Sequence, residues 1–264
     1  HPVRLEIGGT VESIREIRPE MLYLCHRTFY RPDNAALAVV GDVEPQAVLE
    51  LADRWMGAGP AGKPLPLPRR EYPQEPPTVK TARAERSLAV SRPRLLVGIK
   101  DVPARRQGRE LVRRDLALNI ALEAALGKGS DAFVALYEQG LVDDGFSARY
   151  MGETCYGHSL IGGETPDPAR LEERVRQVLE RVAREGVQEE DFQRLKRREL
   201  GEFVAAMDTP EMLANSLITL HFRDTWPGEY LEVLGSLTRE DVNRMLREHV
   251  DPSRMAVSVV LPAA

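Results

Sequence analysis

The stretch Glu20–Val40 reads EMLYLCHRTFYRPDNAALAVV, and the shift that carries Pro32 onto Pro252 places it on Glu240–Val260, which reads EDVNRMLREHVDPSRMAVSVV. Six positions are then identical, and apolar residues meet at others, as Leu22 meets Val242. The identical pairs are Glu20/Glu240, Arg27/Arg247, Pro32/Pro252, Ala36/Ala256, Val39/Val259 and Val40/Val260. Both stretches read as a helix followed by a short apolar strand. The sequence therefore predicts a unit of helices and strands that occurs twice.

The same shift predicts where the two units begin and end. The second unit would occupy about Ala84 to Ala264. Applied backwards from Ala84, the shift places the start of the first unit far upstream of His1, so most of that unit would precede this sequence. We therefore expect the chain to be a fragment. Its first segment, about 58 residues long, should pack against the second unit or against missing sequence, because a free segment of that size would expose much apolar surface.

Prolines mark the boundary between the units. Seven of the 19 prolines fall between Pro60 and Pro77, where helix and central strand are both disfavoured. We predict that residues 1–58 are the C-terminal part of a first domain. Residues 59–83 are predicted to be a Pro-rich linker, and residues 84–264 a complete second domain.

Apolar spacing and helix caps predict the elements. In the first segment we expect a helix over 10–14, helices opened by Pro19 and Pro45, and a buried strand at Ala35–Val40. Beyond the linker we expect strands at 87–90, 94–99, 146–154, 158–161 and 256–261. Helices are expected over 110–126, 131–138, 171–182, 192–203, 212–222 and 238–250. This order predicts an α+β fold in two layers, an antiparallel sheet and its covering helices.

Composition excludes several classes of partner. The 41 acidic and 36 basic residues are interspersed and give a net charge of −5, so no basic face is expected for nucleic acid. No run approaches the roughly 18 apolar residues that span a bilayer, so no membrane partner is expected. The two cysteines, Cys25 and Cys155, fit a reducing compartment better than a disulfide scaffold. A cytoplasmic location is the default expectation.

Several ordered motifs resemble one known family. They are His1-Pro2, the runs Ile7–Ile14, His26–Asn34 and Val39–Val43, and, in the second unit, Ser130–Leu141 and Gly162–Thr165. Together they resemble the pitrilysin/insulinase-type zinc peptidases, which include mitochondrial processing peptidases and bacterial processing proteases. The second-unit motifs are similar to one bacterial branch.

The resemblance implies two homologous α+β domains that close like a clamshell over zinc. In that family an HxxEH helix and a distant Glu supply the ligands and the general base, and all lie upstream of the stretch matched here. We therefore expect residues 1–58 to belong to the catalytic-type domain and 84–264 to the non-catalytic one. No catalytic residue, metal ligand or bound zinc is expected in this chain, and zinc is expected in the intact protein.

Two segments are relevant to the missing metal helix. Met245–His249 imitates HxxEH, but Met245 stands where the first histidine should be, and a thioether is a poor zinc ligand. By the repeat, Leu111–Leu126 is the counterpart of the zinc helix. Because its inward positions are Leu, Ile and Ala, it is predicted to be a core helix.

Substrate contacts are implied less clearly. Active family members often hold the substrate backbone with an Arg and a Tyr, but Leu136-Tyr137-Glu138 has no Arg, and the expected Tyr falls near Asp143 or Asp144. Tyr137 and Tyr150 are the remaining candidates for substrate binding. Aromatic residues at the ends of strands and helices are, however, more often packing residues.

Two functions from different classes follow. In the first, the chain is the C-terminal part of a zinc metalloendopeptidase, a processing protease whose second domain closes over peptide or unfolded polypeptide and positions it. The fragment itself would be inactive. In the alternative, the protein is a non-catalytic scaffold or subunit that binds a protein partner. A homodimer or a heterodimer with a related subunit fits either hypothesis.

Overall fold

The structure is a computed structural model that describes residues 2–56, 66–69, 71–72, 74–102 and 105–263. The chain divides into two units, one of residues 1–75 with 208–218 and one of residues 76–207 with 219–264. The predicted linker, 59–83, lies partly outside the described residues, so its limits stay a prediction.

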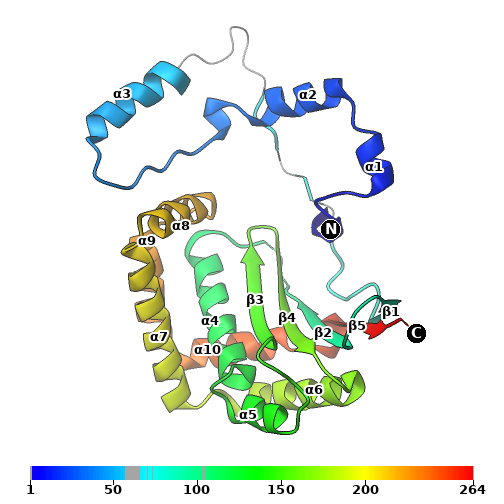
Figure 1. Ribbon diagram of the computed structural model, residues 1–264. Coiled ribbons are helices and arrows are strands. Elements are labelled where there is room, and N and C mark those ends of the chain that lie inside the picture. Colours follow the sequence, from blue (N-terminus) through cyan, green and yellow to red (C-terminus); the bar gives the residue numbers. More distant parts are fainter. Residues whose placement is uncertain (1, 57–65, 70, 73, 103–104, 264) are drawn as a thin grey trace. The chain divides into compact units, whose positions relative to one another are not determined.

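A five-stranded sheet forms one layer of the second unit (Figure 1). Its strands are β1 (Arg83–Leu88), β2 (Arg94–Lys100), β3 (Ser147–Glu153), β4 (Tyr156–Glu164) and β5 (Met255–Pro262). Their order in the sheet is β1-β5-β2-β4-β3, and only β1 departs from antiparallel pairing, since it runs parallel to β5. The predicted α+β class is confirmed, although β1 begins at Arg83, ahead of the strand expected at 87–90.

Helices form the other layer. They are α4 (Gly108–Leu126), α5 (Asp131–Glu138), α6 (Pro168–Glu185), α7 (Glu189–Met207), α9 (Pro227–Ser236) and α10 (Arg239–His249). Helix α8 (Pro210–Phe222) is divided between the units, since its residues 210–218 belong to the first unit. Among the described residues, none of the helices has the length and apolar character needed to cross a bilayer.

Local sequence explains where several helices begin. Ser130 accepts a hydrogen bond from the N–H of Phe133 and so caps α5, and Asp167 caps α6, whose first residue is a proline. Thr238 and Asp241 form a reciprocal capping box at the start of α10. These caps satisfy N–H groups that have no partner inside the helix.

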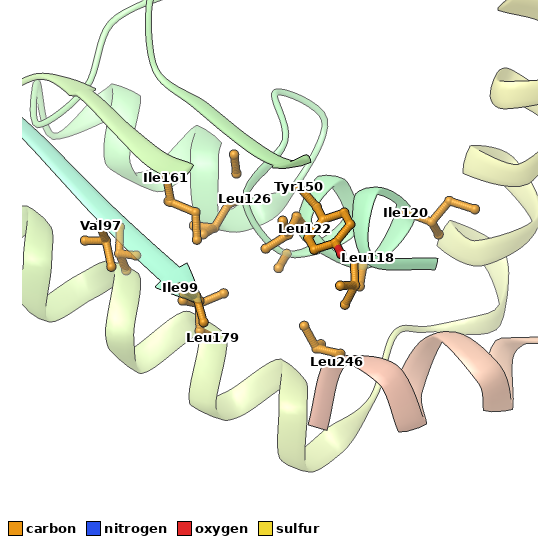
Figure 2. Close-up of a cluster of buried hydrophobic side chains, with 14 of the residues drawn as sticks. Val97, Ile99, Leu118, Ile120, Leu122, Leu126, Tyr150, Ile161, Leu179 and Leu246 are labelled. Atoms are coloured by element: carbon orange, nitrogen blue, oxygen red, sulfur yellow. The ribbon is translucent and has the colours of Figure 1, made fainter. Parts of the chain in front are cut away.

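The core lies between the sheet and α4, α6 and α10. Alternate residues of β2, namely Leu95, Val97 and Ile99, are fully buried, and most of α4 is buried against them. Figure 2 shows Leu118, Leu122 and Leu126 of α4 among these side chains, together with Leu179 of α6 and Leu246 of α10. Burial of each large aliphatic side chain contributes about 1.5–3 kcal/mol, so α4 is the central element of this core.

The first unit has no comparable core among its described residues. It contains α1 (Val11–Arg15), α2 (Pro19–Phe29), α3 (Pro45–Met56) and two short 3-10 helices, Pro2–Arg4 and Pro32–Asn34. None of these five elements has a buried residue. The strand predicted at Ala35–Val40 is wrong, because this segment has no regular structure in the chain. A strand needs a partner for its backbone groups, and no described strand pairs with this segment.

The elements follow the shift found in the sequence. The shift that carries residue 20 onto residue 240 places α2 on 239–249, the bounds of α10, and places Pro32–Asn34 on the 3-10 helix Pro252–Arg254. Residues 35–42 then fall on β5, which lies inside the sheet between β1 and β2. This agreement supports a duplication and explains why the apolar run at 35–40 looks like a buried strand.

Candidate functional site

A hollow of about 650 Å³ borders the outer edge of β3 in the second unit. Residues of α4, β3, α7 and α9 line it. Within the described sheet β3 pairs only with β4, so no strand lies along its other edge. The hollow therefore combines a strand edge with polar helix faces.

Two side chains of α4 bind the edge of β3. Asn119 accepts the N–H of Tyr150 at 3.0 Å through Oδ1 and donates from Nδ2 to the Tyr150 C=O at 3.2 Å. Asp115, one helical turn earlier, accepts the N–H of Gly152 at 3.3 Å. Residues four apart lie on one face of a helix, so this face of α4 is committed to holding β3.

Further acidic groups line the hollow. Glu199 and Glu202 of α7 lie there with Glu123 of α4. Arg198 compensates part of this charge, at 2.7 Å from Glu123, 3.3 Å from Glu202 and 3.8 Å from Glu199. Several carboxylates thus share one guanidinium.

Two of the carboxyl groups hold their protons more tightly than usual. Burial raises the pKa of Asp115 to about 6, against the opposing effect of the Arg223 charge. Burial, and next the charge of Glu202, raise the pKa of Glu199. Perturbed carboxyl groups in a hollow are a recognised sign of a functional site, and the same signs arise in structural networks.

A buried polar network stands behind β3. Asp101, at the end of β2, accepts hydrogen bonds from Arg114 at 2.6 and 3.2 Å, from Arg106 at 2.8 Å and from the Tyr150 hydroxyl at 2.6 Å. Burial opposes ionisation of Asp101, but the hydrogen bonds from His249, Arg114 and Tyr150, with the Arg114 charge, lower its pKa overall. The network therefore holds an ionised carboxylate in the interior.

His249 extends this network into a Ser–His–Asp arrangement. Its Nε2 lies 2.7 Å from the Ser159 hydroxyl and its Nδ1 lies 3.4 Å from Asp101. Because a carboxylate only accepts, Nδ1 carries the proton and Nε2 accepts from Ser159. The order matches that of a serine hydrolase triad, but Ser159 and His249 are 0% exposed. No substrate can reach this serine, so the arrangement is structural.

The same contacts give a structural role to Met245–His249, the segment that imitates HxxEH. Both Met245 and His249 are buried in the second unit, and His249 is held by Ser159 and Asp101. Nowhere in the described part of the chain do three or more His, Cys, Asp or Glu side chains form a group that could hold a metal ion. The described residues do not fit a zinc site.

The two candidate tyrosines have different surroundings. Tyr137, in the last turn of α5, is 50% exposed and its ring stacks on Phe133 at 5.9 Å. Tyr150 is 4% exposed, and its hydroxyl and backbone are occupied by Asp101 and Asn119. The structure does not bring the two together in one hollow, since of the two only Tyr150 lines the cavity beside β3.

Sequence reasoning missed Asp101, Arg114 and Asp115. One signal was available: Arg114 and Asp115 lie among the apolar residues predicted to make this helix a core element, and charged residues in a buried helix require partners. The partner, Asp101, is distant in sequence and could not be named without the fold.

Residues 16–199 match the family described as peptidase M16 inactive domain. The chain belongs to the peptidase M16 family. The M16 chain is 36% identical over 262 residues to the uncharacterized zinc protease YmfH of Bacillus subtilis (strain 168), covering 99% of this chain and 61% of that protein. The predicted resemblance to pitrilysin/insulinase-type peptidases is confirmed.

Solved structures agree with this assignment. A crystal structure of an M16-like peptidase from Alicyclobacillus acidocaldarius matches all of this M16 chain and 62% of its own, with a TM-score of 0.90 and 35% identity. The peptidase M16 inactive domain from Pseudomonas fluorescens shares the fold, with a TM-score of 0.81 at 18% identity over 100% of this chain and 62% of that one. The chain thus spans about three fifths of the length of these relatives.

Proposed function

We propose that this M16 chain is the non-catalytic part of a zinc-dependent metallopeptidase and that its second unit closes over a peptide substrate and positions it. The structural role of α4 supports this proposal most directly. Its apolar residues fill the core, and Asp115 and Asn119 hold the edge of β3. This helix is thus committed to structure, as expected of the inactive member of a domain pair.

Zinc would be held by residues outside this chain. The names printed for its relatives, a zinc protease and an M16-like peptidase, support that part of the proposal. The contribution of this chain would be confinement: a wall that excludes bulk water strengthens electrostatic interactions at a reacting centre and limits which substrates enter. The proposed substrates are peptides or unfolded polypeptides, and the proposed enzyme class is a processing protease.

The first unit supports a longer functional protein. Its helices expose large apolar side chains, among them Leu22, Phe29 and Trp55, and residues 35–42 correspond to the inner strand β5. We propose that further strands and a core helix of the same fold cover this surface in the catalytic-type domain. A cytoplasmic location and a homo- or heterodimer remain part of the proposal.

Substrate contact is proposed at Tyr137 and Tyr150. The exposed ring of Tyr137 is available to meet a peptide side chain. Tyr150 would act through its position on the wall of the hollow, because its hydroxyl is already bound.

Peptide hydrolysis by the full-length protein from the same gene tests the proposal. We expect cleavage of an unstructured peptide that stops with a metal chelator and returns with zinc. Tyr137→Ala should raise KM while kcat changes less, because uniform substrate binding is lost. If the full-length protein binds a protein partner and hydrolyses no peptide, the non-catalytic scaffold is supported instead.

A further inference from the structure

We propose that Asn119 is an edge clamp: its carboxamide takes the place of a neighbouring strand along β3 and keeps that edge from pairing with another polypeptide strand. The clamp is defined by Asn119 and the backbone of Tyr150. It is independent of the proposed peptidase function, because it rests only on contacts within the second unit.

The geometry of the contact is that of a strand pair. A strand presents the N–H and C=O of alternate residues to each side. Both groups of Tyr150 face away from β4 and bind the same Asn119 carboxamide, at 3.0 and 3.2 Å. One side chain thus supplies the acceptor and the donor that a paired residue of a neighbouring strand would supply.

Asp115 extends the protection by one more position. It accepts the N–H of Gly152, which by the two-residue period of a strand points to the same side as Tyr150. By the same period the backbone groups of Ala148, which also lines the hollow, point to that side. A strand that docked at Ala148 would meet the occupied groups of Tyr150 at its next position, so it could not extend.

A free edge of this kind needs protection. Unpaired N–H and C=O groups in a row template pairing with another chain, and proteins block such edges with charges, bulges or covering elements. The hollow of about 650 Å³ leaves room beside β3, so the edge is not closed by bulk alone. Asn119 closes it by occupying the hydrogen-bonding groups.

The test uses the full chain with Asn119→Ala, Asn119→Asp and, as a matched control, Gln177→Ala. Gln177 is an exposed amide on α6 whose hydrogen bonds stay within its own helix. Two quantities are measured: amide hydrogen exchange at Tyr150, and binding of a labelled peptide with the sequence of β3, residues 147–153. Circular dichroism checks that each variant is folded.

We expect exchange at Tyr150 to be about tenfold faster or more in Asn119→Ala, since the hydrogen bond that holds this N–H and the shielding by the side chain are both lost. The β3 peptide should bind saturably to Asn119→Ala and not to the parent or Gln177→Ala. Asn119→Asp retains the acceptor for the Tyr150 N–H but places an oxygen against the Tyr150 C=O, so exchange there should lie between that of the parent and that of Asn119→Ala. The proposal is overturned if Tyr150 stays protected in Asn119→Ala, or if parent and Asn119→Ala treat the peptide alike.

Discussion

Replacing Arg114 by Met should strongly destabilise the second unit. The side chains of Arg114 and Asp101 are 3% and 0% exposed, and Arg114 donates to both Asp101 oxygens, to the Met245 C=O and to Glu248. Met keeps much of the packing volume but leaves the Asp101 carboxylate without its main compensating charge. Removing one member of a buried ion pair costs about 3–5 kcal/mol, which is a large part of the stability of about 5–15 kcal/mol typical of a domain.

The assay is urea unfolding followed by circular dichroism and by Trp226 fluorescence. Trp226 belongs to the second unit and Trp55 to the first, so a Trp55→Phe background isolates the signal. The control is Arg184→Met, because Arg184 pairs with Glu185 at the surface, with 74% and 55% of the two side chains exposed. Such a pair is worth about 0–1 kcal/mol.

A double variant completes this experiment. Asp101→Asn combined with Arg114→Met removes both charges, so its loss of stability should be smaller than the sum of the two single losses. A loss below about 1 kcal/mol for Arg114→Met, or strict additivity in the double variant, would contradict the role assigned to the buried pair.

Three further predictions concern single residues. Since the folded pKa of Asp115 is raised to about 6, its contribution to stability is full below its unfolded pKa and lost as the pH rises through about 6; Asp115→Asn should therefore gain on the order of 1–3 kcal/mol at pH 8, and an unchanged urea midpoint there would refute this. Gly162→Ala should unfold the second unit, because φ is +149° and a Cβ would lie 2.0 Å from the Leu95 carbonyl oxygen; a native melting curve would count against it. Ser159→Ala should cost about 1–3 kcal/mol, as the buried His249 Nε2 loses its donor, and unfolding by urea measures whether it does.

Local signals predicted much of the second unit. The helix expected at 131–138 coincides with α5, and α4 begins at Gly108, just ahead of the expected Glu110. Strands β2, β3 and β5 lie within one residue of their expected bounds. Their residues alternate between buried and more exposed positions, which is the pattern that predicts a strand.

Helix α9 (Pro227–Ser236) was not predicted, and β4 extends beyond the strand expected at 158–161. Two other errors share one physical cause, which is tertiary context. Residues 35–40 have the apolar run of a strand, but no described strand pairs with them. The same pattern therefore forms a strand in β5, which has neighbours on both sides, and forms none here. The hollow was also hidden, since Asn119 and Tyr150 are far apart in the sequence and meet only when α4 crosses β3.

The described residues of this M16 chain form no group that could hold zinc, so we expect the chain not to bind the metal by itself. Metal analysis of the purified full chain after incubation with zinc and buffer exchange tests this expectation. We expect no stoichiometric zinc and no chelator-sensitive cleavage of an unstructured peptide. One tightly bound zinc per chain, accompanied by peptide hydrolysis that a chelator abolishes, would contradict it.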